Sequence, residues 1–324
     1  DRLLRLVSLN GTGEPGVTRD EHHEGRATHQ WAGLFLGPAL AIAMLLSGAP
    51  EGLSDQAWRT ASIGILMAVW WATEAVPIAV TALLPLVVFP LFDIASIHET
   101  ARPYSNKVIY LFLGGFIVAF AMQRWNLHRR IALNVLQVVG GNGRSLVGGF
   151  MVASAVISMW VMNTSTTMML LPIAVSIIGV IHSSVASLTE KGKRDFQYAL
   201  LLGIAYSATI GGMTTLVGTV PNALMAAFML DTYGNEIDFA RWMLVGIPLA
   251  AVMLPLSWLV LTRIVFKVDF VTSGEARAEL RRMKEEMGRI SVPEFRIAVI
   301  FTCMALLWMT RPLLTNLPGL SALD

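Results

Sequence analysis

Long runs of apolar residues alternate with short polar segments along this chain, a pattern typical of helices that cross a membrane. An α-helix rises about 1.5 Å per residue, so about 20 apolar residues span a hydrocarbon core about 30 Å thick. Apolar helices are expected at residues 31–47, 58–72, 76–92, 108–122, 239–266 and 296–310, and a polar loop is expected at 93–106. The pattern predicts an all-α polytopic membrane protein.

Two segments are amphipathic rather than uniformly apolar. Between residues 126 and 139, apolar side chains recur at helical spacing directly after Arg129 and Arg130, as expected of a helix that lies in the membrane interface. Residues 268–294 interleave arginine and lysine with glutamate, which predicts a cytoplasmic amphipathic helix. For this second helix, a solvated linker and a mechanical arm both remain open interpretations.

A polar cluster interrupts the apolar segment from Ser145 to Ile181. Its five consecutive hydrogen-bonding side chains are Asn163-Thr164-Ser165-Thr166-Thr167. An unsatisfied polar group in hydrocarbon costs several kcal/mol, so such groups are tolerated mainly where they line a cavity or bind a ligand. The cluster therefore indicates a solute or ion site at membrane depth.

Basic residues flank this segment on both sides, with Arg144 before it and Lys191, Lys193 and Arg194 after it. The positive-inside rule places both flanks in the cytoplasm. The segment has about 16 apolar residues before the polar cluster and about 14 after it, too few for either half to cross the membrane comfortably. We therefore predict a re-entrant helical hairpin whose tip carries the polar cluster.

The following apolar run, residues 198–230, is too long for one straight helix. Between Thr209 and Asn222 it contains three glycines, a proline and several hydroxyl side chains. Glycine frees the backbone and proline removes a hydrogen-bond donor, so the helix is expected to unwind there. Broken helices of this kind expose carbonyl groups and helix N-termini to the substrates of membrane transporters. Close helix packing is the alternative explanation for Gly211 and Gly212.

Composition narrows the possible functions. Only 14% of the 324 residues are charged and 55% are hydrophobic, which excludes an ordinary soluble domain. A net charge of +2 implies no nucleic-acid partner. The single cysteine, Cys303, excludes an internal disulfide and a cysteine-based metal site. No Ser/His/Asp set or HExxH motif lies at membrane depth, so we do not expect an enzyme.

Two motifs carry a resemblance to a known family. The stretch from Ser158 to Ile173, SMWVMNTSTTMMLLPI, resembles the first hairpin signature of the divalent anion:sodium symporters, the "I'm not dead yet" type of di- and tricarboxylate transporter. Residues 206–212, continuing to 218–222, resemble the unwound helix of that family. The resemblance covers about residues 31–320, the N-terminal part of such a transporter.

The resemblance implies a secondary active carrier of dicarboxylates such as succinate, with citrate as a further candidate, that is coupled to sodium and works by an elevator motion. It implies a homodimer in a bacterial inner membrane, with the hairpin loops and amphipathic arms on the cytoplasmic side. The implied organisation is a polar tail (1–30), scaffold and dimerisation helices with an interfacial arm (31–142), half of a transport domain (143–266), a cytoplasmic arm (267–295) and the start of a second, truncated repeat (296–324).

The implied site lies at the hairpin tip and the broken helix. The residues expected to bind the substrate are Asn163, Thr164, Gly212, Thr215 and Pro221. An amide and a hydroxyl can both donate to a carboxylate, and a helix N-terminus carries roughly half a positive charge. The oxygens expected to bind sodium come from Ser158, Asn163 and Gly211.

The chain departs from the family pattern in two respects. Met162 stands where the family usually has a serine that helps to bind the first sodium ion, and a thioether is a poor ligand for a hard cation. The second hairpin signature of the family is also missing here. A sodium-independent anion exchanger, a sulfate- or phosphate-type permease, and a truncated membrane subunit without transport of its own therefore remain alternatives.

Overall fold

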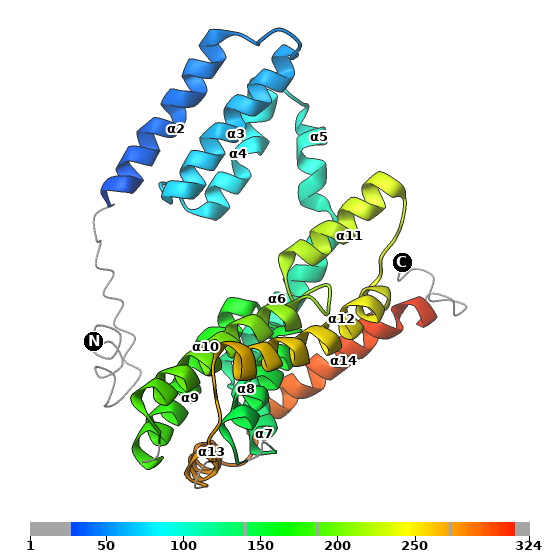
Figure 1. Cartoon of the computed structure of the whole chain (residues 1–324). Helices are drawn as coiled ribbons and strands as arrows, with labels where there is room; N and C mark the ends of the chain where they lie inside the picture. Colours follow the sequence, from blue (N-terminus) through cyan, green and yellow to red (C-terminus); the bar gives the residue numbers. More distant parts are fainter. Residues whose placement is uncertain (1–26, 139–140, 186–187, 272–273, 315–324) are drawn as a thin grey trace. The chain divides into compact units, whose positions relative to one another are not determined.

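The computed structural model describes residues 27–138, 141–185, 188–271 and 274–314. Most of the expected tail at 1–30 and the last residues of the expected second repeat lie outside this part. The described residues form helices and connecting turns (Figure 1). The α-helices are α2 (Thr28–Ser47), α3 (Asp55–Thr73), α4 (Ile78–Leu91), α5 (Ile97–Ala101), α6 (Lys107–Arg124), α7 (Leu127–Gln137), α8 (Gly143–Ser158), α9 (Asn163–Ser184), α10 (Glu190–Gly212), α11 (Val220–Tyr233), α12 (Phe239–Leu259), α13 (Glu275–Glu286) and α14 (Val292–Leu314).

Four of the described helical segments are each long and apolar enough to cross a membrane. They are Thr28–Ser47, Asn163–Ser184, Phe239–Val265 and Val292–Arg311. The third of these continues from α12 through a π-helical turn, Val260–Val265. These segments confirm the predicted all-α membrane fold.

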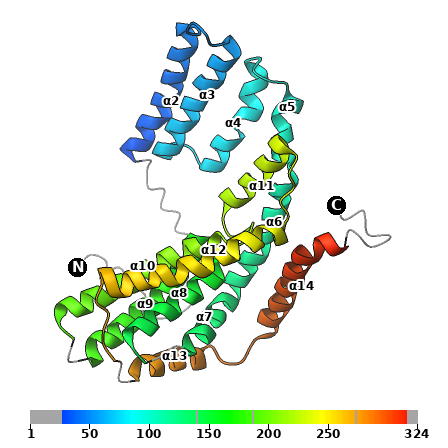
Figure 2. The same ribbon diagram turned by 45° about the vertical axis from the view of Figure 1, so that its right-hand side comes forward.

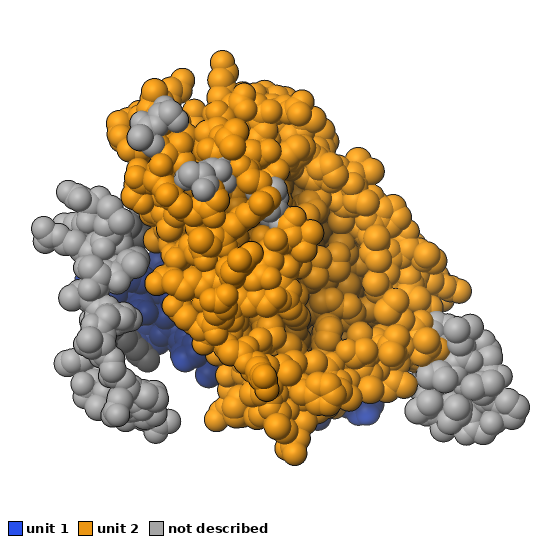
Figure 3. All heavy atoms as spheres, turned by 90° about the horizontal axis from the view of Figure 1, so that it is seen from below, with its two compact units in different colours: residues 1–105 blue, residues 106–324 orange. Residues whose placement is uncertain are grey.

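The chain divides into two compact units, residues 1–105 and 106–324 (Figure 3). In the first unit, α2 packs closely against α3, because a Cβ atom added at Gly33 would lie 1.8 Å from the Thr73 hydroxyl oxygen. The expected loop at 93–106 contains the short helix α5. Ser96 and Glu99 form a capping box at its start, a signal that the apolar pattern did not reveal.

In the second unit, α8 and α9 form a helical hairpin that packs against α10. The Ser154 hydroxyl of α8 donates to the Ile204 carbonyl, and Ala155 contacts Gly211 farther along α10. At the other end of the hairpin, His182 Nε2 lies 3.3 Å from the Lys193 carbonyl oxygen, at the start of α10. The end of α9 therefore lies beside the start of α10.

The two halves of the hairpin differ in length. Helix α8 has 16 residues, in agreement with the apolar count, but α9 has 22. It is longer than expected because it begins within the polar cluster at Asn163 and continues to Ser184. The expectation that neither half is long enough to cross a membrane is therefore wrong for α9, although it holds for α8.

The hairpin and α10 share the main hydrophobic core of the second unit. Its largest fully buried side chains include Phe150, Leu170, Ile177 and Phe196. In Figure 2, α8, α9, α10 and α12 run alongside one another, and α13 lies near the ends of these helices. This core fixes the relative positions of the hairpin and the broken helix.

Both amphipathic helices pack against this core. Helix α7 buries Leu133 and Leu136, and α13 buries Ala276 and Leu280. Helix α13 is shorter than the predicted segment 268–294, and it contacts α7 and α9. The Ser176 hydroxyl on α9 donates to the Glu279 carboxylate on α13. Helix α13 is therefore docked on the hairpin rather than surrounded by solvent.

The long helix is interrupted where glycine, proline and hydroxyl residues accumulate. Helix α10 ends at Gly212 and α11 begins at Val220, with an irregular turn between them. Pro221 occupies the first turn of α11, where a backbone N–H would have no acceptor within the helix. The lack of an N–H in proline therefore costs no helical hydrogen bond there. The predicted broken helix is confirmed.

Candidate functional site

The tip of the hairpin places two side-chain oxygens together. A short turn connects the end of α8 at Ser158 to the start of α9 at Asn163. The Ser158 hydroxyl, which is fully buried, donates to Asn163 Oδ1 at 2.7 Å. Asn163 itself is half-buried. The pair therefore holds the Asn163 amide in a defined orientation at the edge of the core.

The end of α10 approaches the tip so closely that only glycine fits there. A Cβ atom at Gly212 would lie 2.4 Å from Asn163 Oδ1, and one at Gly211 would lie 2.2 Å from the Ala155 carbonyl oxygen. Real Cβ atoms essentially never come within 3.0 Å of such neighbours. The two glycines thus have a packing role, and the same contacts bring Asn163, Gly211 and Gly212 together.

These oxygens have the chemistry that a sodium ion requires. Hydroxyl, amide and carbonyl oxygens are hard, neutral ligands, and the described residues contain no cluster of three or more His, Cys, Asp or Glu side chains that could hold a metal. The Gly211 carbonyl accepts from the Thr214 N–H at 3.0 Å and from the Thr214 hydroxyl at 2.6 Å. If the Thr214 hydroxyl rotated away, a lone pair of the Gly211 carbonyl oxygen would become available to a cation.

Thr215 stabilises the turn between α10 and α11. Its hydroxyl is buried, donates to the Met159 carbonyl at the hairpin tip, and accepts from the Gly218 N–H at 3.0 Å. Thr215 is one of the residues predicted to bind the substrate, but its hydroxyl hydrogen is already donated to the Met159 carbonyl. This bond connects the two elements that form the site.

Asn222 is a site residue to which the sequence reasoning assigned no role. Its amide nitrogen donates to the Gly212 carbonyl at 2.9 Å and to the Thr215 carbonyl at 2.7 Å, and it is buried. These bonds satisfy one carbonyl at the end of α10 and one in the turn that follows it, where no helical partner is available. The sequence feature that could have indicated this role is an amide side chain directly after Pro221, at the start of an apolar helix.

Aromatic side chains hold neighbouring helices against the tip. Trp160 stacks on Phe239 of α12 with ring centroids 5.8 Å apart and meets Phe301 of α14 edge-on at 4.9 Å. The Trp242 indole N–H donates to the Met213 carbonyl at 2.9 Å. Periodicity gave no sign of these contacts, because they join residues far apart in the chain.

Two helix N-termini provide partial positive charge. Helix α9 begins after Met162, whose side chain offers no oxygen to cap the first N–H groups. Helix α11 begins after Thr219, whose side chain makes no capping hydrogen bond. Uncapped N–H groups at a helix N-terminus favour anions. Thr164 and Pro221, the other predicted substrate residues, lie in these first turns and are exposed.

One hydroxyl of the polar cluster lacks a partner in the described structure. Thr166 is 1% exposed, and its Oγ1 atom makes no hydrogen bond to any described residue. A buried polar group without a partner destabilises the fold by about 1–3 kcal/mol. The first turn of α9 therefore has hydrogen-bonding capacity that the described protein groups leave unused.

Comparison with known proteins identifies the family. A family model described as the sodium:sulfate symporter transmembrane region matches residues 28–318. The chain belongs to this family. Its curated relatives include sodium-dependent dicarboxylate transporters of Staphylococcus aureus, from strain MRSA252 (39% identity over 289 residues) and strain bovine RF122 / ET3-1 (39% over 286 residues). The matches cover 89% and 88% of this chain but 56% and 55% of the two relatives. The chain thus spans about half the length of these two relatives.

Proposed function

We propose that this chain is part of a secondary active transporter that carries dicarboxylates such as succinate and is coupled to sodium. The observation that carries the proposal is the convergence of Ser158, Asn163 and Gly212 at the hairpin tip. The relatives, named as sodium-dependent dicarboxylate transporters, support the choice of substrate and ion. Citrate is a second candidate substrate.

The two ends of the Asn163 amide suggest how an ion and an anion are coupled. Its oxygen faces the Ser158 hydroxyl and can join the Gly211 carbonyl as a sodium ligand. Its nitrogen can then donate to a carboxylate, because an amide accepts only through oxygen and donates only through nitrogen. A bound sodium ion would fix this orientation and add positive charge beside the anion. In this account sodium binding raises the affinity for the dicarboxylate.

The N-terminal ends of α9 and α11 would bind the carboxylate groups. Each end contributes roughly half a positive charge, and the first N–H groups have no helical acceptor. Thr164 adds an exposed hydroxyl in the first turn of α9, and Pro221 fixes the first turn of α11. Gly212 contributes by leaving room for the Asn163 amide.

We further propose an elevator motion in which residues 143–266 move and residues 31–142 form the dimerising scaffold of a homodimer in a bacterial plasma membrane. The shared core of the hairpin and α10 supports movement of these elements as one body. Helices α7 and α13 pack on that core and are the candidate arms. The positive-inside rule supports a cytoplasmic position for both arms.

Sodium-independent exchange is the second candidate, and Met162 is the observation that favours it. Its side chain is 40% exposed and cannot supply the hard oxygen that a serine would offer. A sulfate-type permease also fits uncapped helix N-termini, which bind tetrahedral dianions as well as carboxylates.

The test is dicarboxylate uptake by the complete gene product carrying Asn163→Ala or Thr164→Ala. Thr302→Ala is the matched control, because the Thr302 hydroxyl only donates to the Ala298 carbonyl of its own helix. We expect Asn163→Ala to reduce uptake by about 100-fold or more, since it removes both a sodium ligand and a carboxylate donor. Thr164→Ala should raise the apparent KM, and Thr302→Ala should have no effect. Unchanged uptake by the Asn163 and Thr164 variants would refute the proposed site.

A further inference from the structure

The second unit contains a basic pocket of about 510 Å³ that the proposed transport function does not use. It is lined by the end of α6, the start of α7, the end of α13 and the segment that leads into α14. Three arginines line it: Arg124, Arg129 and Arg289. Among the described residues, none of their guanidinium groups has a hydrogen bond or an ion pair.

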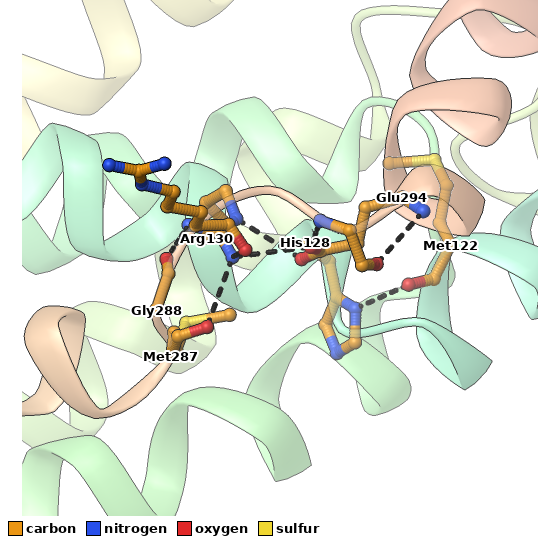
Figure 4. Close-up of polar contacts among 8 residues, drawn as sticks. Met122, His128, Arg130, Met287, Gly288 and Glu294 are labelled. Carbon is orange, nitrogen blue, oxygen red and sulfur yellow. Dashed lines mark hydrogen bonds and ion pairs between the residues drawn. The ribbon is translucent and has the colours of Figure 1, made fainter.

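A clamp centred on Arg130 holds Glu294, which lines the pocket (Figure 4). Arg130 donates through Nε and Nη2 to the two carboxylate oxygens of Glu294, at 3.1 and 3.2 Å, and through Nη1 to the Gly288 carbonyl at 3.0 Å. Glu294 is 5% exposed and also accepts from the Ser291 N–H at 2.7 Å. These bonds hold the turn between α13 and α14 against α7.

The clamp also determines the charge of the pocket. The two acids that line it are Glu286 and Glu294. Glu294 is neutralised by Arg130, whereas Glu286 shares Arg282, at 3.7 Å, with Glu279. The three lining arginines therefore outnumber the one lining carboxylate that has no ion-pair partner of its own, and the concave site carries net positive charge. Guanidinium groups bind phosphate oxygens through paired hydrogen bonds, so the pocket suits a phosphate group.

The position of the pocket favours a lipid headgroup over a soluble phosphate. Arg124 is the last residue of the apolar helix α6, and Glu294 lies in the first turn of α14, a candidate membrane span. Next to the pocket, Val292 and Phe295 are 63% and 59% exposed. Trp125, a residue type enriched at the membrane–water interface, lines the pocket. Exposed apolar side chains beside a basic pocket are suited to the acyl chains of a phospholipid.

We propose that this pocket binds the phosphodiester headgroup of an anionic phospholipid. Basic pockets between membrane helices on the cytoplasmic side are suited to such headgroups. The bound lipid would contact the end of α6, α7 and the α13–α14 turn at once, and so would link the two amphipathic helices to the membrane surface.

The test is native mass spectrometry of the detergent-purified complete gene product, titrated with phosphatidylglycerol, with phosphatidylcholine or with inorganic phosphate. The variant is the triple substitution Arg124→Gln, Arg129→Gln and Arg289→Gln. The matched control removes three exposed basic charges outside the pocket, by Lys191→Gln, Arg194→Gln and Arg263→Gln. If the glutamine variant does not fold, it is replaced by a variant in which the same three arginines are changed to lysine, which keeps the charge of the pocket.

We expect the glutamine variant to bind phosphatidylglycerol on the order of 100-fold more weakly than the unmodified protein, and the control to stay within about threefold. The lysine variant should bind weakly, because it loses the paired hydrogen bonds. Equal losses in the pocket variant and the control would overturn the proposal, since they would indicate only a general attraction to positive charge. Binding of phosphatidylcholine or inorganic phosphate as tight as that of phosphatidylglycerol would overturn the assignment to an anionic lipid.

Discussion

Substitution of Gly211 by alanine tests the close contact on which the site depends. A methyl group at this position would lie 2.2 Å from the carbonyl oxygen and 2.6 Å from the Cα atom of Ala155. Both neighbours are backbone atoms, so rotation of a side chain cannot relieve the clash. Helices α8 and α10 would have to separate by about 1 Å to restore an ordinary carbon–oxygen contact.

The expected cost follows from two opposing effects. Overpacking of a close-packed core costs about 1–3 kcal/mol, and a backbone clash belongs at the upper end of this range. Alanine in place of glycine stabilises a helix by at most about 1 kcal/mol. The net loss should be about 2 kcal/mol, which corresponds to a fall of about 5 °C in Tm.

Gly179→Ala is the matched control. Gly179 also lies within a helix, α9, but a Cβ atom there would have no neighbour within 4 Å. Thermal unfolding of the complete gene product in detergent should give a lower Tm for Gly211→Ala and an equal or higher Tm for Gly179→Ala. Sodium-dependent uptake should fall with Gly211→Ala, because the separation moves α10 away from the hairpin tip. Equal Tm values for the two variants would refute the close approach of α8 and α10.

Three further predictions concern individual side chains. Gly212→Ala should reduce sodium-dependent uptake by at least about tenfold, because the added methyl group displaces the Asn163 side chain. Its loss of Tm should be smaller than that of Gly211→Ala, because a side chain rather than the backbone has to move. A normal sodium dependence of uptake would contradict this prediction. Met162→Ser should lower the sodium concentration for half-maximal uptake by adding a hydroxyl oxygen, and an unchanged value would mean that other groups complete the ion site. Burial lowers the pKa of His128 below its ordinary value of 6.5, so the unfolded chain binds more protons and stability should fall as the pH drops through 6.5. In His128→Asn, which can still donate to the Met122 carbonyl, the fall in Tm between about pH 7.5 and 5.5 should be smaller; an identical pH dependence would show that His128 is not its source.

The elements of this fold could be predicted because their signals are local. Glycine, proline and hydroxyl residues mark the break between α10 and α11, and the polar cluster at Asn163 marks the hairpin tip. Each signal reflects a backbone or solvation cost that exists whatever the tertiary context. The length of α9 was underestimated because apolar counting stops at polar residues, whereas a helix continues through them when their side chains bond to its own backbone, as Thr167 bonds to the Asn163 carbonyl.

The geometry of the candidate site depends on contacts that the sequence pattern does not encode. Ser154 bonds to Ile204, fifty positions away, and Trp160 packs between Phe239 and Phe301. Nothing in the periodicity of either segment reveals its partner. The role of Asn222 was missed for the same reason, because its amide satisfies carbonyls that become exposed only after α10 has unwound. The roles of the predicted substrate and sodium residues remain predictions.

The most direct test of sodium-coupled dicarboxylate transport is uptake of labelled succinate into proteoliposomes that contain the complete gene product. Uptake is measured with and without an inward sodium gradient, and with and without internal dicarboxylate. The account predicts uptake that the sodium gradient stimulates and that needs no internal dicarboxylate. Uptake that depends only on internal dicarboxylate, or no uptake of succinate under any of these conditions, would contradict it.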